Sequence, residues 1–178
     1  AFSATPSDGE VGFPLVPELE IGISTRGSQS WLDPCHPSSL APWKRPRLTP
    51  NPAMVLKDGA LFMPFGTPGG DAQVQAMVQT FLNIVEFDMD PQRAIEQPRA
   101  ISQNFPNSFW PHRYRPGQVN VEGRISAEVM DDLESVGHKV TRDIAWTSAA
   151  GGVCAVVVDR ERGGLVGGAD PRRESYAI

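Results

Sequence analysis

The junction between an apolar run and a helical segment at Pro68-Gly69-Gly70-Asp71 is the place in this sequence best suited to chemistry. A helix N-terminus presents N–H groups without intrahelical acceptors, together with the positive end of the helix dipole. Because glycine has no Cβ, the backbone at Gly69 and Gly70 lets a ligand approach closely. The spacing therefore indicates a site that stabilises an anion.

Three interpretations of this junction are open from the spacing alone. The anion could be a phosphate, or the oxyanion of a tetrahedral intermediate in acyl transfer. A phosphate is disfavoured, because neither G-x-x-x-x-G-K-[ST] nor G-x-G-x-x-G occurs with the two glycines. The third interpretation involves no chemistry: a tight turn in which Asp71 caps the following helix.

The helices and strands that position this junction are predicted from the periodicity of apolar residues and from turn residues. We expect a strand over residues 1–8, and a loop-rich segment over residues 9–52, where repeated prolines exclude long helices. Residues 53–66 read as a hairpin with its turn at Asp58-Gly59. A helix follows from Asp71, and Val74, Met77, Val78, Phe81, Leu82 and Val85 fall on one face of it.

Two further helices and a terminal hairpin complete the prediction. Asp90-Pro91 is typical of a helix start, and Ser126 caps a helix that carries Val129, Leu133 and Val136 as its stripe and ends at Gly137. Residues 153–170 predict two strands joined by a charged turn. Because strands and helices occur in separate blocks, the sequence favours an α+β fold over the alternating strand–helix order of a Rossmann fold.

Composition narrows the possible partners of the chain. The length favours one domain over residues 1–178, and the net charge of −5 argues against nucleic acid or an anionic membrane as the main partner. Its apolar runs are too short to span a bilayer. Two separate cysteines and three scattered histidines have no ligand-like spacing, so we expect no metal and no cofactor. The compartment is not readable from the sequence.

Residues 44–99, from KRPRLTPNP to IEQPR, resemble the small-subunit signature of the γ-glutamyltransferase (γ-glutamyltranspeptidase) family. The ending GLVGGADPRRESYAI and the opening AFSATPSD also resemble that family. The resemblance implies an N-terminal-nucleophile hydrolase with an αββα sandwich, of which this chain is the small-subunit portion without its first strand. It further implies a precursor that cleaves itself, so the expected partner is the large subunit of the same precursor.

The resemblance assigns a mechanism to the glycines. A terminal threonine uses its own α-amino group as general base, and the N–H groups of Gly69 and Gly70 form the oxyanion hole. That threonine would lie one strand upstream of Ala1, so we expect a processed or truncated chain. Ser7 and Asp8 fall near a threonine and an asparagine that support the nucleophile and the substrate in this family. A simple turn explains Ser7 and Asp8 equally well.

The resemblance also places a substrate pocket, and here the sequence departs from the family. Gln29 stands where γ-glutamyl enzymes have an acidic residue for the substrate ammonium group, and one hydroxyl of a serine pair is retained as Thr49. Arg26 is suited to a substrate carboxylate, although a solvated loop arginine is the alternative. These changes favour an acyl group that carries a carboxylate without an ammonium group.

Three functions therefore stay open at the level of sequence. The first is γ-glutamyl transfer or hydrolysis through an acyl-enzyme, with a small γ-glutamyl or related acyl amide as substrate. The second is a glutaryl- or cephalosporin-type acylase. The third is a catalytically inactive fragment or a binding module. A threonine upstream of Ala1 in the parent gene would separate the third from the first two.

Overall fold

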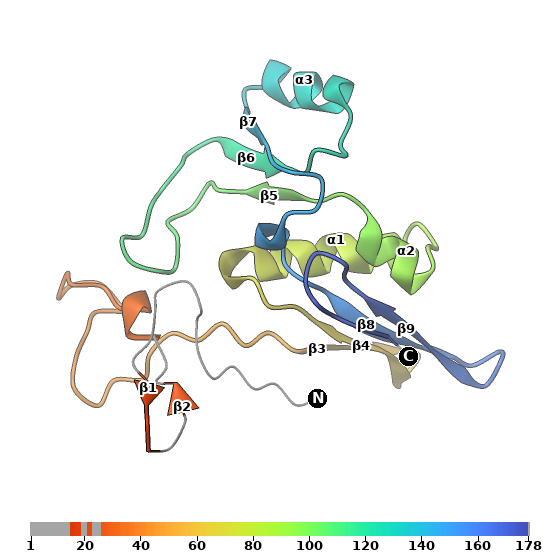
Figure 1. The fold of residues 1–178 in the computed structure, drawn as a ribbon, viewed down its shortest axis with the longest axis horizontal. Coiled ribbons are helices and arrows are strands. Elements are labelled where there is room, and N and C mark those ends of the chain that lie inside the picture. The colour runs from red at the N-terminus through yellow and green to blue at the C-terminus, as the bar shows by residue number, and fades with distance from the viewer. Residues whose placement is uncertain (1–14, 19–20, 23–25, 178) are drawn as a thin grey trace.

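The computed structural model describes residues 15–18, 21–22 and 26–177. The strand predicted over residues 1–8, and with it Ser7 and Asp8, lies outside the described residues. The fold is mixed α+β, as the sequence predicts. Figure 1 shows two sheets with a pair of helices between them, and the loops before β3 gathered beside one end of this stack.

Four antiparallel strands form the larger sheet in the order β3-β4-β8-β9. Their bounds are Ala53–Lys57, Ala60–Gly66, Cys154–Asp159 and Gly164–Ala169. The predicted hairpin between β3 and β4 is confirmed. Its turn residues Asp58 and Gly59 have φ angles of 51° and 76°, the positive values that a tight primed turn requires.

A second sheet has the order β5-β6-β7, with β5 antiparallel and β7 parallel to β6. Its strands are Ala100–Ser102, Gln118–Val121 and Lys139–Arg142. A small two-stranded ribbon, β1 (Leu15–Val16) with β2 (Ile21–Gly22), precedes both sheets. As predicted from the prolines, the described part of residues 26–52 contains only the short 3₁₀-helix η1 (Arg26–Gln29) and no α-helix.

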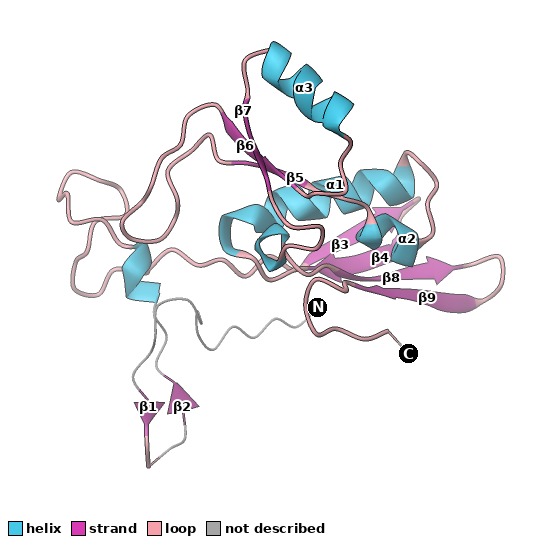
Figure 2. Ribbon diagram, turned by 45° about the horizontal axis from the view of Figure 1, so that its top comes forward, coloured by secondary structure: helices cyan, strands magenta, loops and turns pink. Residues whose placement is uncertain are grey.

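The α-helices are α1 (Gln73–Val85), α2 (Pro91–Glu96) and α3 (Ala127–Ser135). Short 3₁₀ turns precede α1, as η2 (Gly70–Ala72), and β8, as η3 (Ser148–Ala150). The predicted caps are confirmed: Asp90 accepts from the N–H groups of Gln92 and Arg93, and Ser126 accepts from that of Val129. Helix α1 lies between the two sheets, as Figure 2 shows from a second direction.

Two glutamines of α1 fasten the free edge of β5. The Gln75 side chain accepts from Ser102 N–H (2.8 Å) and donates to Ser102 C=O (3.2 Å). Gln79 makes the same pair of bonds to Ala100, at 3.1 and 2.9 Å. Because an unpaired strand edge leaves backbone groups unsatisfied, these side chains replace a missing strand and fix α1 against the smaller sheet.

The apolar face predicted for α1 lies mostly outside the core of this chain. Val74, Val78, Leu82 and Val85 are between 43% and 61% exposed, and of the six predicted residues only Met77 is buried. The buried face is instead Gln73, Ala76, Met77, Thr80 and Ile84. Small side chains let this face of α1 pack closely against its neighbours, and its glutamines bond to β5. These tertiary contacts, rather than the spacing of apolar residues, decide which face of the helix is buried.

The stripe predicted for α3 is also corrected. Met130 is its buried residue, whereas Val129 and Val136 are exposed. The main core lies between the larger sheet and helices α1 and α2, and its buried members are Met63, Ala76, Ile84, Ala94, Ile95, Val153 and Ala155.

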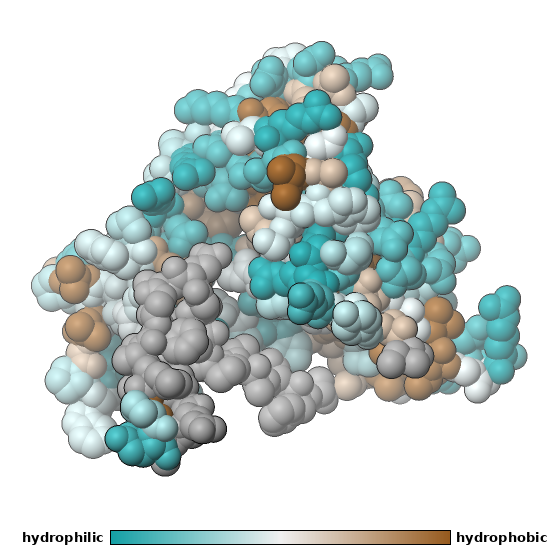
Figure 3. Space-filling view, in the orientation of Figure 1, coloured by the Kyte–Doolittle hydropathy of each residue, from teal (hydrophilic) through white to brown (hydrophobic). Residues whose placement is uncertain are grey.

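Apolar side chains also remain exposed on the larger sheet. Figure 3 shows hydrophobic atoms gathered over the end of this sheet beside the C-terminus. The large hydrophobic residues exposed on its strands are Met54, Leu56, Leu61, Val156 and Leu165. Among the described residues, no helix is both long and apolar enough to cross a bilayer.

Candidate active site

The glycine pair lies where β4 ends and η2 begins. Gly69 has φ 136° and Gly70 has φ 55°, both in the region that favours glycine. Because they are the first residues of a helical turn, their N–H groups have no acceptor within that turn. The Gly69 and Gly70 carbonyl groups accept instead from Ala72 and Gln73. The junction therefore has the backbone conformation that an oxyanion site requires.

A second pair of glycines, Gly151 and Gly152, packs against the first. A Cβ on Gly69 would lie 3.0 Å from Gly151 Cα, and a Cβ on Gly151 would lie 2.8 Å from Thr67 Oγ1. The Thr67 hydroxyl donates to Pro68 C=O (2.6 Å) and accepts from Gly152 N–H (2.7 Å). The turns at residues 67–70 and 150–152 are thus packed backbone to backbone.

Asp71 is not a helix cap, which corrects that interpretation of the junction. No side chain caps η2. The Asp71 carboxylate instead accepts from the Ser108 N–H (2.6 Å) and from the Ser108 hydroxyl. Asp71 therefore anchors the loop of residues 103–117, which connects β5 to β6, directly beside the glycine pair.

Phe109 follows this anchor and lies over Gly70. A Cβ on Gly70 would be 3.4 Å from Phe109 Cε2, its nearest neighbour outside its own helical turn among the described residues. The aromatic ring therefore forms one wall of the space above the glycine turn.

Arg26, Gln29 and Thr49 lie together, as candidate residues of one pocket should. Arg26 Nη1 donates to Thr49 Oγ1 (2.6 Å) and lies 3.5 Å from Gln29 Oε1. Arg26 is 7% exposed and Gln29 is 1% exposed, so Arg26 is not a solvated loop residue. The Gln29 Nε2 atom has no hydrogen-bond partner among the described residues. This cluster, formed by η1 and the loop before β3, is basic and polar.

The 103–117 loop connects this cluster to the glycine turn. Trp110 N–H donates to Ser28 C=O (2.7 Å), between Arg26 and Gln29 in the chain. The two ring nitrogens of His112 lie 2.9 Å from Asn107 C=O and 3.2 Å from Ser30 C=O.

Aromatic stacking strengthens the same connection. Trp31 is stacked between His36 (ring centroids 4.1 Å apart) and His112 (4.0 Å), and Trp110 meets His112 edge-on. The two loops that meet here are distant in sequence, so the spacing of their histidines and tryptophans along the chain does not reveal the contact.

A buried ionic network lies next to the turn of residues 150–152. Arg99 pairs with Asp170 (2.7 Å), and Arg172 bridges Asp170 (3.1 Å) and Glu122 (2.5 Å). All four side chains are almost fully buried. Buried charges require partners of this kind, since isolated ones are strongly disfavoured.

The network sets the ionisation of its members. Burial opposes the charged form of Glu122, but hydrogen bonds from Arg172, Arg99 N–H and Thr147 N–H outweigh burial, so the pKa of this carboxyl is lowered. Burial, reinforced by the nearby Arg172 charge, lowers the pKa of Arg99. For Arg172, burial is outweighed by its bonds and charge interactions with Glu122 and Asp170, so its pKa is raised.

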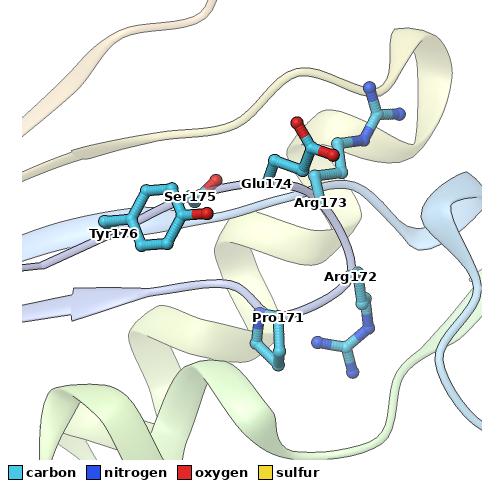
Figure 4. A pocket seen from close by; sticks show the side chains of 6 residues that line it. All are labelled: Pro171, Arg172, Arg173, Glu174, Ser175 and Tyr176. Atoms are coloured by element: carbon cyan, nitrogen blue, oxygen red, sulfur yellow. The ribbon is translucent and has the colours of Figure 1, made fainter.

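A separate pocket of about 350 Å³ is lined by residues 171–176 (Figure 4). Arg172 and Arg173 point in opposite directions from the chain there. Arg172 is held by the ionic network, and Arg173 donates to Ser148 C=O (2.9 Å). Neither the glycine pair nor Arg26 lines this pocket, so we do not assign chemistry to it. Within the described residues, no group of histidine, cysteine, aspartate and glutamate side chains could hold a metal ion.

Comparison with known proteins identifies the family. The profile of the gamma-glutamyltranspeptidase family matches residues 2–178. The chain belongs to the gamma-glutamyltranspeptidase family. This confirms the resemblance inferred from residues 44–99 and from the two ends of the sequence.

Curated relatives include several hydrolases. The chain is 35% identical over 156 residues to the glutathione hydrolase-like YwrD proenzyme of Bacillus subtilis, covering 88% of this chain and 28% of that protein. It is 30% identical over 164 residues to the oxamate amidohydrolase proenzyme of Klebsiella pneumoniae, covering 92% and 30%. It is 31% identical to the acylase ACY 1 proenzyme of a Pseudomonas species, covering 83% and 24%. The chain thus spans less than a third of each of these relatives.

Solved structures share the fold. LmbA2991HD superposes with a TM-score of 0.83 at 40% identity, covering 93% of this chain and 29% of that one. The cephalosporin acylase from Bacillus halodurans gives 0.75 at 29% identity, covering 88% and 27%. The gamma-glutamyltranspeptidase from Pseudomonas nitroreducens, at 19% identity, gives 0.75 and covers 93% and 84%. The mixed α+β fold of gamma-glutamyltranspeptidases therefore extends over most of the chain.

Several residues of the site were not singled out from the sequence. Ser108 and Phe109 reach the glycine turn only through tertiary contacts, and no motif marks them. Thr67 lies next to the glycines in sequence, but its bond to Gly152 N–H exists only in the folded chain. The ending GADPRR, by contrast, is part of the segment that resembles the family, and it contributes Asp170 and Arg172 to the buried network. Its Asp-Pro-Arg-Arg run after a strand is a local signal for these two residues.

Proposed function

We propose that the protein containing this chain cleaves an amide bond through an acyl-enzyme, with the N–H groups of Gly69 and Gly70 as the oxyanion hole. Family membership supports this proposal, as do the left-handed conformations of two adjacent glycines at a helix N-terminus.

The chemistry follows that of acyl transfer. The hydroxyl oxygen of a terminal threonine, expected upstream of Ala1, attacks the amide carbonyl carbon, and its proton passes to the α-amino group. The C–N bond then breaks, and the leaving amine takes that proton. Water or an acceptor amine releases the acyl group. Gly69 and Gly70 stabilise the negative oxygen at both tetrahedral stages. Ser7 and Asp8 keep their proposed supporting roles near the nucleophile.

We propose an acyl group that carries a carboxylate as the substrate class. The observation that supports it most is the Arg26–Thr49 hydrogen bond of 2.6 Å inside a buried cluster. The fixed guanidinium suits a carboxylate. γ-Glutamyl and glutaryl groups both carry a carboxylate, but the γ-glutamyl group also carries an ammonium group. Gln29, which is neutral, pairs an ammonium group less well than an acidic side chain would.

The names of the relatives are consistent with this preference. Oxamate, after which one relative is named, carries a carboxylate and no ammonium group, and two others are acylases. Hydrolysis or transfer of a γ-glutamyl group is the second candidate function, because other relatives are glutathione hydrolases. We therefore place a glutaryl-type acyl group first and a γ-glutamyl group second.

The deciding experiment compares a glutaryl anilide with a γ-glutamyl anilide, using the full-length protein. Arg26→Ala should lower kcat/KM for the glutaryl substrate by roughly 10- to 100-fold, because a buried charged hydrogen bond is lost. Gln29→Glu should shift the preference toward the γ-glutamyl substrate. Equal loss on an uncharged acetyl anilide would reject the role of Arg26 in carboxylate binding. No turnover of any anilide by a protein with a terminal threonine would favour the binding-module alternative.

We further propose that residues 1–178 are one domain, the small-subunit part of an αββα sandwich, and that the large subunit of the same precursor covers its exposed apolar faces. Support comes from the exposed stripe Val74, Val78, Leu82 and Val85 and from the apolar residues left open on the larger sheet. The relatives are proenzymes, of which the chain spans less than a third. Denaturing mass analysis of the purified full-length protein should show two polypeptides, and a single uncleaved one would contradict the proposal.

A further inference from the structure

We propose that Thr67 is a positioning residue that aims the Gly69 N–H at the oxyanion, and that the buried Arg99–Asp170–Arg172–Glu122 network holds Thr67's partner in place. This inference rests on the amide-cleaving function proposed above. Thr67 does not itself contact the substrate in this proposal. Its role follows from the peptide unit to which its hydroxyl is bonded.

The first step of the argument is the geometry of one peptide plane. The Thr67 hydroxyl donates to Pro68 C=O at 2.6 Å. The Pro68 carbonyl and the Gly69 N–H belong to the same planar peptide unit, and in a trans peptide they point in opposite directions. Fixing the carbonyl oxygen therefore fixes the direction of the N–H. Without this bond, the wide conformational freedom of Gly69 would leave its donor poorly aimed.

The second step is the bond that holds the hydroxyl itself. Gly152 N–H donates to Thr67 Oγ1 at 2.7 Å, so the hydroxyl is oriented by a donor from a different segment. The three groups form a chain from Gly152 N–H through the Thr67 hydroxyl to Pro68 C=O. Successive hydrogen bonds of this kind polarise one another. The position of residue 152 thus determines the position of the Gly69 donor.

The third step is the anchoring of residues 147–153 by the ionic network. Glu122 accepts from Thr147 N–H (3.1 Å), and Arg99 donates to Ala150 C=O (3.0 Å). Asp170 accepts from Val153 N–H (2.9 Å). Three members of one buried network therefore hold the segment on both sides of Gly152. The network therefore acts on the turn of residues 67–70 through residues 147–153.

Positioning of this kind matters because an oxyanion donor acts only when it is already in place. Misplacing such a donor by about 1 Å costs on the order of 100-fold in rate. Substrate binding, which uses Arg26 and Thr49 in our proposal, does not depend on the same peptide plane. A defect at Thr67 should therefore appear in kcat rather than in KM.

The test compares Thr67→Val with Thr67→Ser in the full-length protein. Valine keeps the shape but removes the hydroxyl, whereas serine keeps the hydroxyl. Thr141→Val, at an exposed position of β7, controls for the substitution itself. We expect Thr67→Val to lower kcat on an acyl anilide by about 10- to 100-fold with KM changed less than about twofold. Thr67→Ser and Thr141→Val should stay within about threefold of the wild type.

Hydrogen exchange makes the inference independent of the substrate assignment. Amides of residues 66–73 and 148–154 should exchange faster in Thr67→Val than in Thr67→Ser, with the midpoint of thermal unfolding similar in both. Unchanged exchange in Thr67→Val would overturn the positioning role, whether or not the anilides are turned over. Wild-type kcat in Thr67→Val would overturn it as well. Failure of the wild type to cleave any anilide would count only against the proposed function.

Discussion

The Arg26 guanidinium donates a hydrogen bond of 2.6 Å to the hydroxyl of Thr49, across 23 positions of sequence. Arg26 begins the short 3₁₀-helix η1, and Thr49 lies in the loop before β3. Loops hold a charged side chain in one orientation only when other groups fix it, and the Thr49 hydroxyl is such a group. The pair therefore links the conformation of two loops to the orientation of one cation.

Replacing Thr49 with valine should weaken substrate binding without changing the chemical step. Loss of the hydroxyl removes the bond that orients Arg26, and about 1 kcal/mol, or roughly fivefold in KM, is expected for a carboxylate-bearing acyl anilide. Thr49→Ser, which keeps the hydroxyl, is the matched control. Steady-state kinetics on the full-length protein measures both. A change confined to kcat would contradict the binding role.

Adding a single methyl group at Gly70 should abolish most turnover. In Gly70→Ala, a Cβ enters the left-handed conformation at φ 55° and meets the Phe109 ring at 3.4 Å. Such strain costs about 1 kcal/mol in stability, but displacement of the oxyanion donor should reduce kcat by about 100-fold or more. The bulkier Gly70→Val should abolish turnover completely.

Gly163→Ala is the control for this prediction. Gly163 also has a positive φ, 67°, but a Cβ there would meet no atom of the described, non-adjacent residues within 4 Å. Its variant should therefore carry a similar stability cost with an unchanged kcat. Comparable losses of activity in the two variants would mean that backbone strain, rather than the site, explains the result.

Local signals predicted much of the fold. The Asp58-Gly59 turn, the caps at Asp90 and Ser126, and the glycine pair depend on adjacent residues, and the structure confirms the hairpin and the caps. The burial of α1 could not be predicted in the same way. Gln75 and Gln79 look like solvent-facing residues in sequence, but they bond to the edge of β5, so a different face of the helix is exposed.

The candidate pocket shows the same division. The family resemblance named Arg26, Gln29 and Thr49, and the structure places them in contact or close to it. Phe109 and Ser108 were not found, because their relation to Gly70 and Asp71 exists only after the 103–117 loop folds over the glycine turn. Contacts between residues far apart in the chain do not produce a periodic pattern, so one sequence alone does not reveal them.

Phe109 should limit the size of the group accepted above the glycine turn. Phe109→Ala removes the ring that lies beside Gly70, so a bulky aromatic acyl anilide should gain about 10-fold in kcat/KM relative to a glutaryl anilide. Phe105→Ala, in the same loop and 40% exposed, should leave this ratio unchanged. The ratio of the two kcat/KM values is the measurement. An unchanged ratio in Phe109→Ala would place the substrate elsewhere.

The lowered pKa of Glu122 predicts how acid destabilises the protein. A carboxyl whose folded pKa lies below its usual value of 4.5 contributes stability that is fully present above pH 4.5. This contribution is lost as the pH falls through the folded pKa, because protonation removes the pairing with Arg172. The measurement is the midpoint of thermal unfolding between pH 7 and pH 3, for the full-length wild type and for Glu122→Gln.

The gap between these two proteins should be constant above about pH 5.5 and should narrow below pH 4.5, because the wild-type carboxyl then becomes neutral like the glutamine. Glu134→Gln, at an exposed position of α3, should follow the wild type at every pH. A gap that persists unchanged down to pH 3 would show that the charge of Glu122 does not contribute to stability. In that case the network would act through shape and hydrogen bonding alone, and its anchoring of residues 147–153 would be insensitive to acid.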